Sequence, residues 1–389
     1  MKRVAVTHTA TRGPYLADAP PLDEPLSSPR ARKMMSRSAY LAALALADLM
    51  RATNVSPETR AQVGYYLGVG GSAGSLDDVT ALLDASIVDD RFSLPAFGGR
   101  GLAACNPLLA FQLMNNFTMC HGAILENLGG PNSALFSRGA GTIAAIEEAR
   151  YAVASGECPL AIAGGADVGT HPVTLAELAR DGHLAARMVP ADAAALIALA
   201  PSTSSDDVIL EGGAHASGRG RPLTDAIEDA LGRAIGTAGT ASRDAASRVR
   251  HGRHAWHATL QSPASPLHAT TIANLNPVEV VATGVAPVRL PDTEVLSAPM
   301  TAPMTAPMTV VIAPWGPHAA DALRSYATRF AGAAVIDACV HGDAIAATPA
   351  LALIAAVDVL RAMPGVALVL SLGVDGDPGV IVLSRGGVA

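Results

Sequence analysis

The chain has 389 residues; half of them are hydrophobic, 4% are aromatic and 16% are charged, and the formal net charge is −7. This composition provides a large core of Ala, Val, Leu and Ile, and it argues against a disordered, fibrous or coiled-coil protein. The acidic balance offers no overall basic face, so we expect no binding to nucleic acid.

Hydrophobic patterning predicts alternating strands and helices in the first half of the chain. Strands are expected at Val4–Val6, Val63–Val69, Ser133–Ser137, Leu160–Ala163 and Ala193–Ala200, helices at Ser36–Ala52, Pro107–His121 and Thr142–Ser155, and a loop over residues 10–30. Between Gly130 and Asp167 the order is strand, turn, helix, strand, and such a βαβ unit implies a parallel sheet.

The second half repeats this alternation. Strands are expected at Val208–Glu211, Val310–Ala313, Ala333–Ala338, Val366–Leu370 and Val380–Leu383, and helices at Leu223–Ile235, Ala319–Phe330 and Ala347–Ala362. Residues 236–309 are irregular, and three copies of Ala-Pro-Met-Thr at Ala298–Thr309 predict an exposed linker, because Pro at every fourth residue excludes a helix. The class is therefore α/β with an internal duplication.

Cysteine usage and hydropathy give expectations about the compartment. Cys105, Cys120, Cys158 and Cys339 form no C-x-x-C pair and no zinc-type cluster, so we expect free thiols in a reducing environment and no metal site. His8 and Arg12 interrupt any signal-peptide region, and the apolar stretch Ala344–Val357 is shorter than the ~20 residues of a membrane span. We expect a cytoplasmic protein without a membrane segment.

A set of motifs in fixed order covers most of the chain. It comprises Arg32-Lys33-Met34-Met35-Ser36-Arg37, then Gly130-Pro131-Asn132, Gly156-Glu157 and Gly164-Gly165-Ala166-Asp167, and finally the C-terminal run from Val366 to Gly376. The set resembles the thiolase-like β-ketoacyl synthases of fatty acid and polyketide assembly. The resemblance implies a five-layer αβαβα sandwich of two duplicated halves, residues 1–200 and 201–389, with the irregular insert at about 236–309.

The resemblance also implies where the catalytic residues of a ketosynthase fall. Those enzymes carry the acyl chain on a Cys at a helix N-terminus, where its pKa is lowered, and use two His and a supporting Lys for decarboxylative condensation. In this chain the Cys position falls on Gly139, the first His on Trp315, the second His on Asp343 and the Lys near Ala338. All four groups are lost, so we expect no condensing activity from the chain alone.

A ketosynthase fold without the nucleophile is most similar to the chain length factors, the β subunits of type II polyketide ketosynthases. The resemblance implies a pseudoenzyme that forms a heterodimer with a Cys-containing ketosynthase and shapes its acyl tunnel. It implies no cofactor, because the acyl chain arrives on the phosphopantetheine of an acyl carrier protein. Many factors of aromatic systems carry Gln at the Cys position, so Gly139 argues against an aromatic system and leaves polyene-type (reducing) systems open.

The helix before the Gly-Pro-Asn turn carries the candidate tunnel gate. In the family this helix lies at the dimer interface, and here the spacing of Met114, Phe117, Thr118 and His121 places them on one helical face. Met and Phe are bulky plugs for an alkyl tunnel, and ordinary core packing is the alternative. The strand near Ser133–Ser137 is the expected interface edge, and its exposure predicts poor behaviour of the chain expressed alone.

Two other functions stay open. An enzyme of altered chemistry, a decarboxylase or an acyl-thioester hydrolase, would need Asp343, Ser137 or His341. A carrier-protein scaffold would hold carriers without changing chain length. The basic run of Arg243, Arg248, Arg250 and Arg253, with His251, His254 and His257, is a candidate docking site for an acidic carrier protein, with a solvated loop as the alternative.

Overall fold

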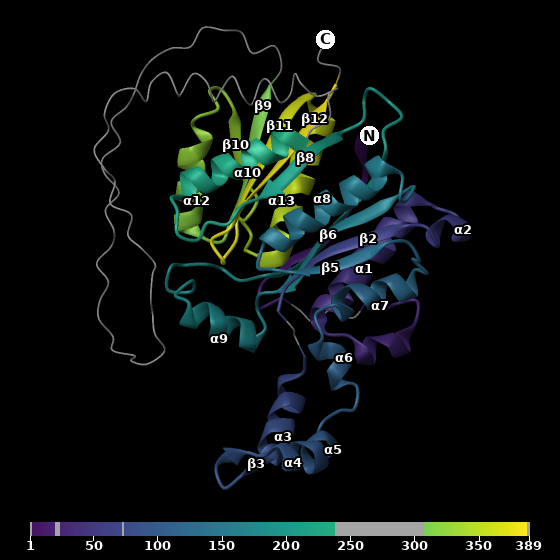
Figure 1. Ribbon diagram of the computed structural model, residues 1–389, viewed down its shortest axis with the longest axis vertical. Helices are drawn as coiled ribbons and strands as arrows, with labels where there is room; N and C mark the ends of the chain where they lie inside the picture. The colour runs from purple at the N-terminus through teal and green to yellow at the C-terminus, as the bar shows by residue number, and fades with distance from the viewer. Residues whose placement is uncertain (1, 20–23, 72–73, 238–306, 387–389) are drawn as a thin grey trace.

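The computed structural model describes residues 2–19, 24–71, 74–237 and 307–386 (Figure 1). The basic run and most of the Ala-Pro-Met-Thr repeat lie outside the described residues, so the docking hypothesis for the basic run stays a prediction.

The described strands form one large sheet and a separate small hairpin. The large sheet has the order β10-β9-β11-β12-β8-β1-β7-β6-β2-β5. Its strands are β1 (Val4–Tyr15), β2 (Gly64–Val69), β5 (Asn132–Phe136), β6 (Ala161–Val168), β7 (Asp192–Pro201), β8 (Ile209–His215), β9 (Met308–Pro314), β10 (Ala334–Asp337), β11 (Gly365–Leu372) and β12 (Pro378–Arg385).

The strand order repeats within this sheet. In one half β5, β2 and β6 are parallel, β7 is antiparallel to β6, and β1 is antiparallel to β7. In the other half β10, β9 and β11 are parallel, β12 is antiparallel to β11, and β8 is antiparallel to β12. The two halves meet where Ala5 of β1 pairs with Ile209 of β8. This repeat confirms the duplication; the boundary near residue 200 stays a prediction.

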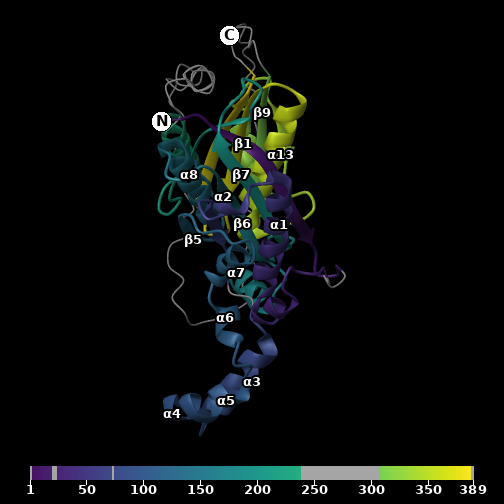
Figure 2. The ribbon, with the colours of Figure 1, turned by 90° about the vertical axis from the view of Figure 1, so that its right-hand side faces the viewer.

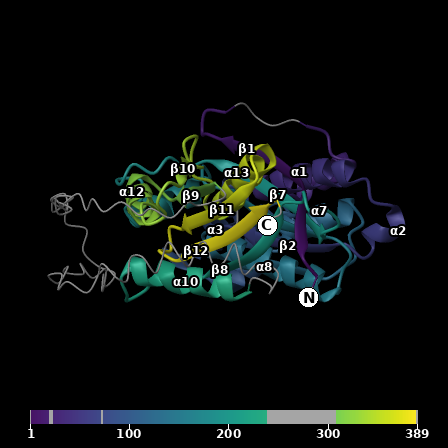
Figure 3. The ribbon, with the colours of Figure 1, turned by 90° about the horizontal axis from the view of Figure 1, so that it is seen from above.

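Helices complete a five-layer αβαβα arrangement (Figure 3). Helices α1 (Arg37–Thr53) and α7 (Phe117–Leu125) lie on the outer side of the first half, and α10 (Leu223–Thr237) and α12 (Pro317–Ala327) on that of the second. Helices α8 (Ala140–Ser155) and α13 (Thr348–Ala362) form the central layer. Each of these two contacts strands of both halves, and their apolar side chains lie in one central core cluster.

Local sequence signals explain where the main helices begin and end. The Ser36 hydroxyl accepts a hydrogen bond from the Ala39 N–H at the start of α1, and Asn54 adopts the left-handed conformation after its last turn. Helix α8 ends at Gly156, whose φ of 84° favours glycine. These are the helices that periodicity predicts.

The central layer packs closely because two strand residues lack side chains. A Cβ at Gly68 of β2 would lie 2.6 Å from the backbone of Thr142 in α8. A Cβ at Gly165 of β6 would lie 2.3 Å from the carbonyl oxygen of Ala346. Glycine at both positions therefore permits the first half to contact the starts of both central helices.

Three expectations about local structure are wrong. Strand β1 runs to Tyr15, within the expected loop 10–30, because His8–Arg12 pair with β7. The helix expected at Pro107–His121 is interrupted: α6 (Leu109–Leu113) ends before Met114, whose ψ of 118° is not helical. Strand β9 includes Met308 and Thr309, the end of the third Ala-Pro-Met-Thr copy, because both pair with β11 and are buried.

The apolar stretch near residue 345 is longer than expected. Residues Ile345–Ala362 are long and apolar enough to cross a membrane by length and composition, and 67% of this stretch is buried. It consists of the short helix η4 (Ile345–Ala347) and α13 of the central layer. Core helices of this kind pass the same test as membrane spans.

A segment between β2 and α6 projects from the sandwich (Figures 1 and 2). It contains α3 (Leu76–Ser86), β3 (Ile87–Val88), β4 (Arg91–Phe92), α4 (Leu94–Ala96), η2 (Phe97–Gly101) and α5 (Leu102–Ala104), and we call it the arm. The main contacts of these elements are with one another. Exposed apolar side chains on the described part of the arm are Leu76, Leu83, Ile87, Val88, Phe92, Leu94 and Leu102.

The remaining short helices lie at the periphery. They are η1 (Pro29–Met34), α2 (Pro57–Arg60) and α9 (Pro172–Arg180), and α9 precedes the loop that leads to β7.

Candidate functional site

Gly139, where the sequence resemblance leads us to expect the nucleophile position, lies at the junction of β5 and α8. Gly139 is the N-terminal cap residue of α8, with a φ of 125°. A Cβ at this position would lie 3.0 Å from the Cα of Gly373, in the turn between β11 and β12. Any side chain here would therefore meet both an unfavourable backbone conformation and a close backbone neighbour.

Gly139 and Asp343 line the same small cavity. Its volume is about 10 Å³, and its wall is formed by Gly139, Ala313, Asp343, Ile345, Thr348, Pro349, Ser371, Leu372, Gly373 and Val374. One water molecule needs roughly 10–15 Å³ of such space. The space between Gly139 and Asp343 thus holds one water molecule at most.

Trp315 lies beside this cavity, directly after β9. Its ring meets the ring of His183 edge-on, with 4.6 Å between centroids. It packs with Leu178, Met188 and Ile345, and burial lowers the pKa of His183. Sequence reasoning placed Trp315 at a catalytic position, and the structure puts it against residues that line the cavity, where an indole supplies packing and no base.

Asp343 is a buried carboxylate with one unsatisfied oxygen. Its exposed fraction is 4%. Oδ1 accepts hydrogen bonds from the Ile345 N–H at 2.8 Å and the Thr348 hydroxyl at 2.6 Å, whereas Oδ2 has no partner among the described residues. Burial raises the pKa of Asp343 to about 6.

A second buried carboxylate, Asp167 at the end of β6, lies close to Asp343. It accepts hydrogen bonds from the N–H groups of Val168 at 2.8 Å and Ala346 at 3.2 Å. Its pKa is raised to about 7, mainly by burial and to a smaller extent by the negative charge of Asp343. Sequence reasoning treated Asp167 only as a motif residue; a carboxylate next to the apolar run that forms β6 was the available signal.

The residues proposed for altered chemistry lie in separate surroundings. The Ser137 hydroxyl donates to Oδ2 of Asp375 at 2.9 Å, and no His is among its hydrogen-bond partners in the described part of the chain. His341 is exposed, and Asp343 faces the closed cavity. Ala338, at the expected Lys position, contributes only its backbone N–H to Ile312. Nothing in this arrangement activates Ser137 as a nucleophile.

The expected gate residues do not share one face. Thr118 and His121 point inward: Thr118 hydrogen-bonds Ser38 of α1 at 3.2 Å, and burial lowers the pKa of His121. Phe117 is half-buried, 5.3 Å between ring centroids from His121, and Met114 is 51% exposed. The spacing argument fails because Met114 lies outside the helix that carries the other three.

The reactivity of Cys120 and the placement of metal-binding side chains bear on other chemistry. Cys120 is partly buried in α7, and burial raises the pKa of its thiol, which favours the protonated form. Within the residues that the structure describes, no group of three or more His, Cys, Asp or Glu is placed to hold a metal ion.

The family is shown by a model that matches half of the chain. The model is described as the N-terminal domain of β-ketoacyl synthase, and it matches residues 1–196. The chain therefore belongs to the β-ketoacyl synthase family. A search of curated proteins found no sequence that matches it.

Solved structures agree in fold. One is a type II polyketide synthase acyl-carrier protein in complex with its ketosynthase bound to the hexaketide, with a TM-score of 0.64, 11% identity, and coverage of 99% of this chain and 100% of that chain. The ishigamide ketosynthase/chain length factor has a TM-score of 0.63 and 17% identity, with coverage of 99% of this chain and 100% of that chain. An oxazolomycin ketosynthase domain of Streptomyces albus JA3453 has a TM-score of 0.55 and 13% identity, with coverage of 92% of this chain and 61% of that chain. At these identities the likeness is one of fold.

The raised pKa values predict how stability depends on pH. Because the pKa of Asp343 is about 6 in the folded chain and 3.8 ordinarily, the folded state binds more protons between these values, and the free energy of unfolding falls as the pH rises through this range. Asp167, whose pKa is raised to about 7, extends this fall in the free energy of unfolding to higher pH.

We expect Asp343→Asn to reduce this fall. Between pH 5 and pH 8 the free energy of unfolding of the variant should fall by roughly 1–3 kcal/mol less than that of the unsubstituted chain, because the variant has no carboxylate at this position to ionise. Urea unfolding at the two pH values measures this difference. Asp321→Asn, at an exposed carboxyl, is the control. An unchanged pH dependence in Asp343→Asn would contradict the assignment.

Proposed function

We propose that this chain is a non-catalytic chain length factor that pairs with an active ketosynthase in a type II polyketide synthase, with polyene-type systems included. One observation carries the proposal: Gly139 and Asp343 line a cavity of about 10 Å³. A scaffold of this family with glycine at the expected nucleophile position and no acyl space beside it fits a role beside a catalytic partner. The partner supplies the Cys and both His.

The surface of the chain supports pairing with another subunit. Strand β5 is at an edge of the sheet, and Phe136 on it is 59% exposed. The arm presents further exposed apolar side chains, among them Phe92 and Leu94. Free strand edges and apolar surfaces of this kind are typical of protein interfaces.

The structural neighbours support the kinds of partner. One is a ketosynthase in complex with an acyl-carrier protein, and another is a ketosynthase/chain length factor. We accordingly propose two partners for this chain: a Cys-containing ketosynthase, and an acyl carrier protein that delivers the acyl chain on phosphopantetheine. The proposal places the complex in the cytoplasm, in keeping with the burial of Ile345–Ala362 as a core helix.

Co-expression with the Cys-containing ketosynthase of the same locus tests the pairing. We expect native mass spectrometry of the purified material to show a 1:1 heterodimer, because the free edge and the arm need a partner. The chain expressed alone serves as the control and should be poorly soluble. A well-behaved homodimer that ignores the ketosynthase would refute the proposal.

Variants of Phe117 and Met114, the two gate residues that are not fully buried, test the effect on chain length. Phe117→Ala and Met114→Ala should shift the products of the complex toward longer chains, with the larger shift for Phe117, because a smaller side chain no longer ends the tunnel. Met363→Ala, an exposed residue at the far end of α13, is the matched control. Mass spectrometry of the products measures the shift. Unchanged product length in an intact heterodimer would favour the scaffold function.

A further inference from the structure

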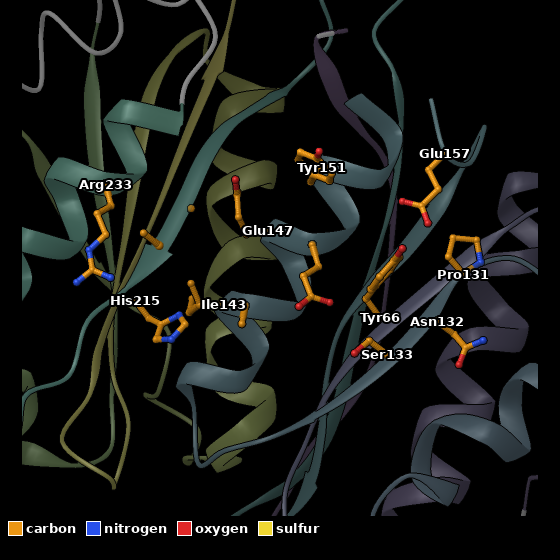
Figure 4. A pocket seen from close by; sticks show the side chains of 14 residues that line it. Tyr66, Pro131, Asn132, Ser133, Ile143, Glu147, Tyr151, Glu157, His215 and Arg233 are labelled. Atoms are coloured by element: carbon orange, nitrogen blue, oxygen red, sulfur yellow. The ribbon is translucent and has the colours of Figure 1, made fainter. Parts of the chain in front are cut away.

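An open groove lies along the free edge of the first half (Figure 4). Its volume is about 750 Å³. Tyr66 of β2 and Ser133 of β5 lie at one side, Tyr151 of α8 lies above them, and His215 of β8 and Arg233 of α10 lie across from them. The groove thus spans both halves of the sandwich beside β5.

The strand beside the groove has one unpaired side. Strand β5 pairs with β2 from Asn132 to Phe136, and no other described strand pairs with it. The backbone N–H and C=O groups on its other side are therefore available to a strand of another subunit.

The wall of the groove next to this edge is acidic. Glu148 of α8 and Glu157 after α8 are exposed, and neither has an ion pair among the described residues. Both lie close enough to Tyr66 to help raise its pKa to about 12, after the larger effect of burial. By contrast, Glu147 is paired with Arg150, and Arg233 with Asp229. Among the described residues, the uncompensated charge near β5 is therefore negative.

Symmetry decides what this charge does in an assembly. When two copies pair through the same edge about a two-fold axis, both contribute the same surface to the interface. That interface would hold four carboxylates, Glu148 and Glu157 of each copy, with no basic counterpart from these positions, and an excess of like charge at one interface is unfavourable.

We infer that Glu148 and Glu157 select the subunit that covers β5: they disfavour a second copy of this chain and favour a ketosynthase-fold partner with Lys or Arg at the facing positions. The inference rests on the proposed function, which supplies the kind of partner. The edge strand provides the attraction common to both pairings, and the two carboxylates provide the difference between them.

Differently tagged copies of this chain, co-expressed with the ketosynthase, test the selection. Tandem affinity purification at low salt measures the ratio of self-pairs to heterodimers. We expect Glu148→Gln with Glu157→Gln to raise the share of self-pairs about tenfold, and higher salt to raise that of the unsubstituted chain, because salt screens the repulsion. Asp321→Asn with Asp358→Asn removes the same charge from exposed positions elsewhere and should change nothing.

A second pair of variants, Glu148→Lys with Glu157→Lys, should weaken the heterodimer at least tenfold. If heterodimers form but neither set of variants alters the pairing, the charge selection is wrong and the proposed function stands. If no heterodimer forms with any variant while self-pairs respond to charge and salt, the proposed function is wrong and the repulsion is upheld.

Discussion

The structure depends on one constraint, which is that both halves of the large sheet share a single central layer of two helices. The link between the halves is direct: the Thr142 hydroxyl of α8 donates to the carbonyl oxygen of Ala346 at 2.5 Å, and Asp167 accepts from the Ala346 N–H. The backbone of Asp343 is held by Val189 and Ala191 of the other half. The segment before α13 is thereby fixed from the first half of the chain.

This constraint explains why the space between Gly139 and Asp343 is small. Because α8 and α13 begin at the same junction, any space between Gly139 and Asp343 has to be bounded by backbone from both halves. Gly373 lies so close to Gly139 that a side chain there would be crowded. The two buried carboxylates remain as a cost to stability at neutral pH, partly offset by their hydrogen bonds. Under the proposed function the junction is structural, and a partner supplies the chemistry.

Sequence patterns predict the parts of this molecule that depend on local order. The strands and helices of both halves follow from periodicity, and the family motifs place Gly139 and Asp343 at one site. The proximity of Asp167 to Asp343 is not visible in sequence, because it arises from tertiary packing of residues 176 positions apart. The expectation that the four gate residues share one face failed for a local reason: the chain leaves the helical conformation at Met114, and a helical-face argument requires an unbroken helix. The arm went unpredicted, since its short elements carry little periodicity.

The most direct test is to find which subunit carries the acyl group. The purified heterodimer is incubated with a carrier protein that bears an acyl thioester, and intact-protein mass spectrometry then weighs each subunit. We expect the acyl mass only on the Cys-containing ketosynthase, because the cavity at Gly139 has neither nucleophile nor space. An acyl adduct on this chain would contradict a non-catalytic role.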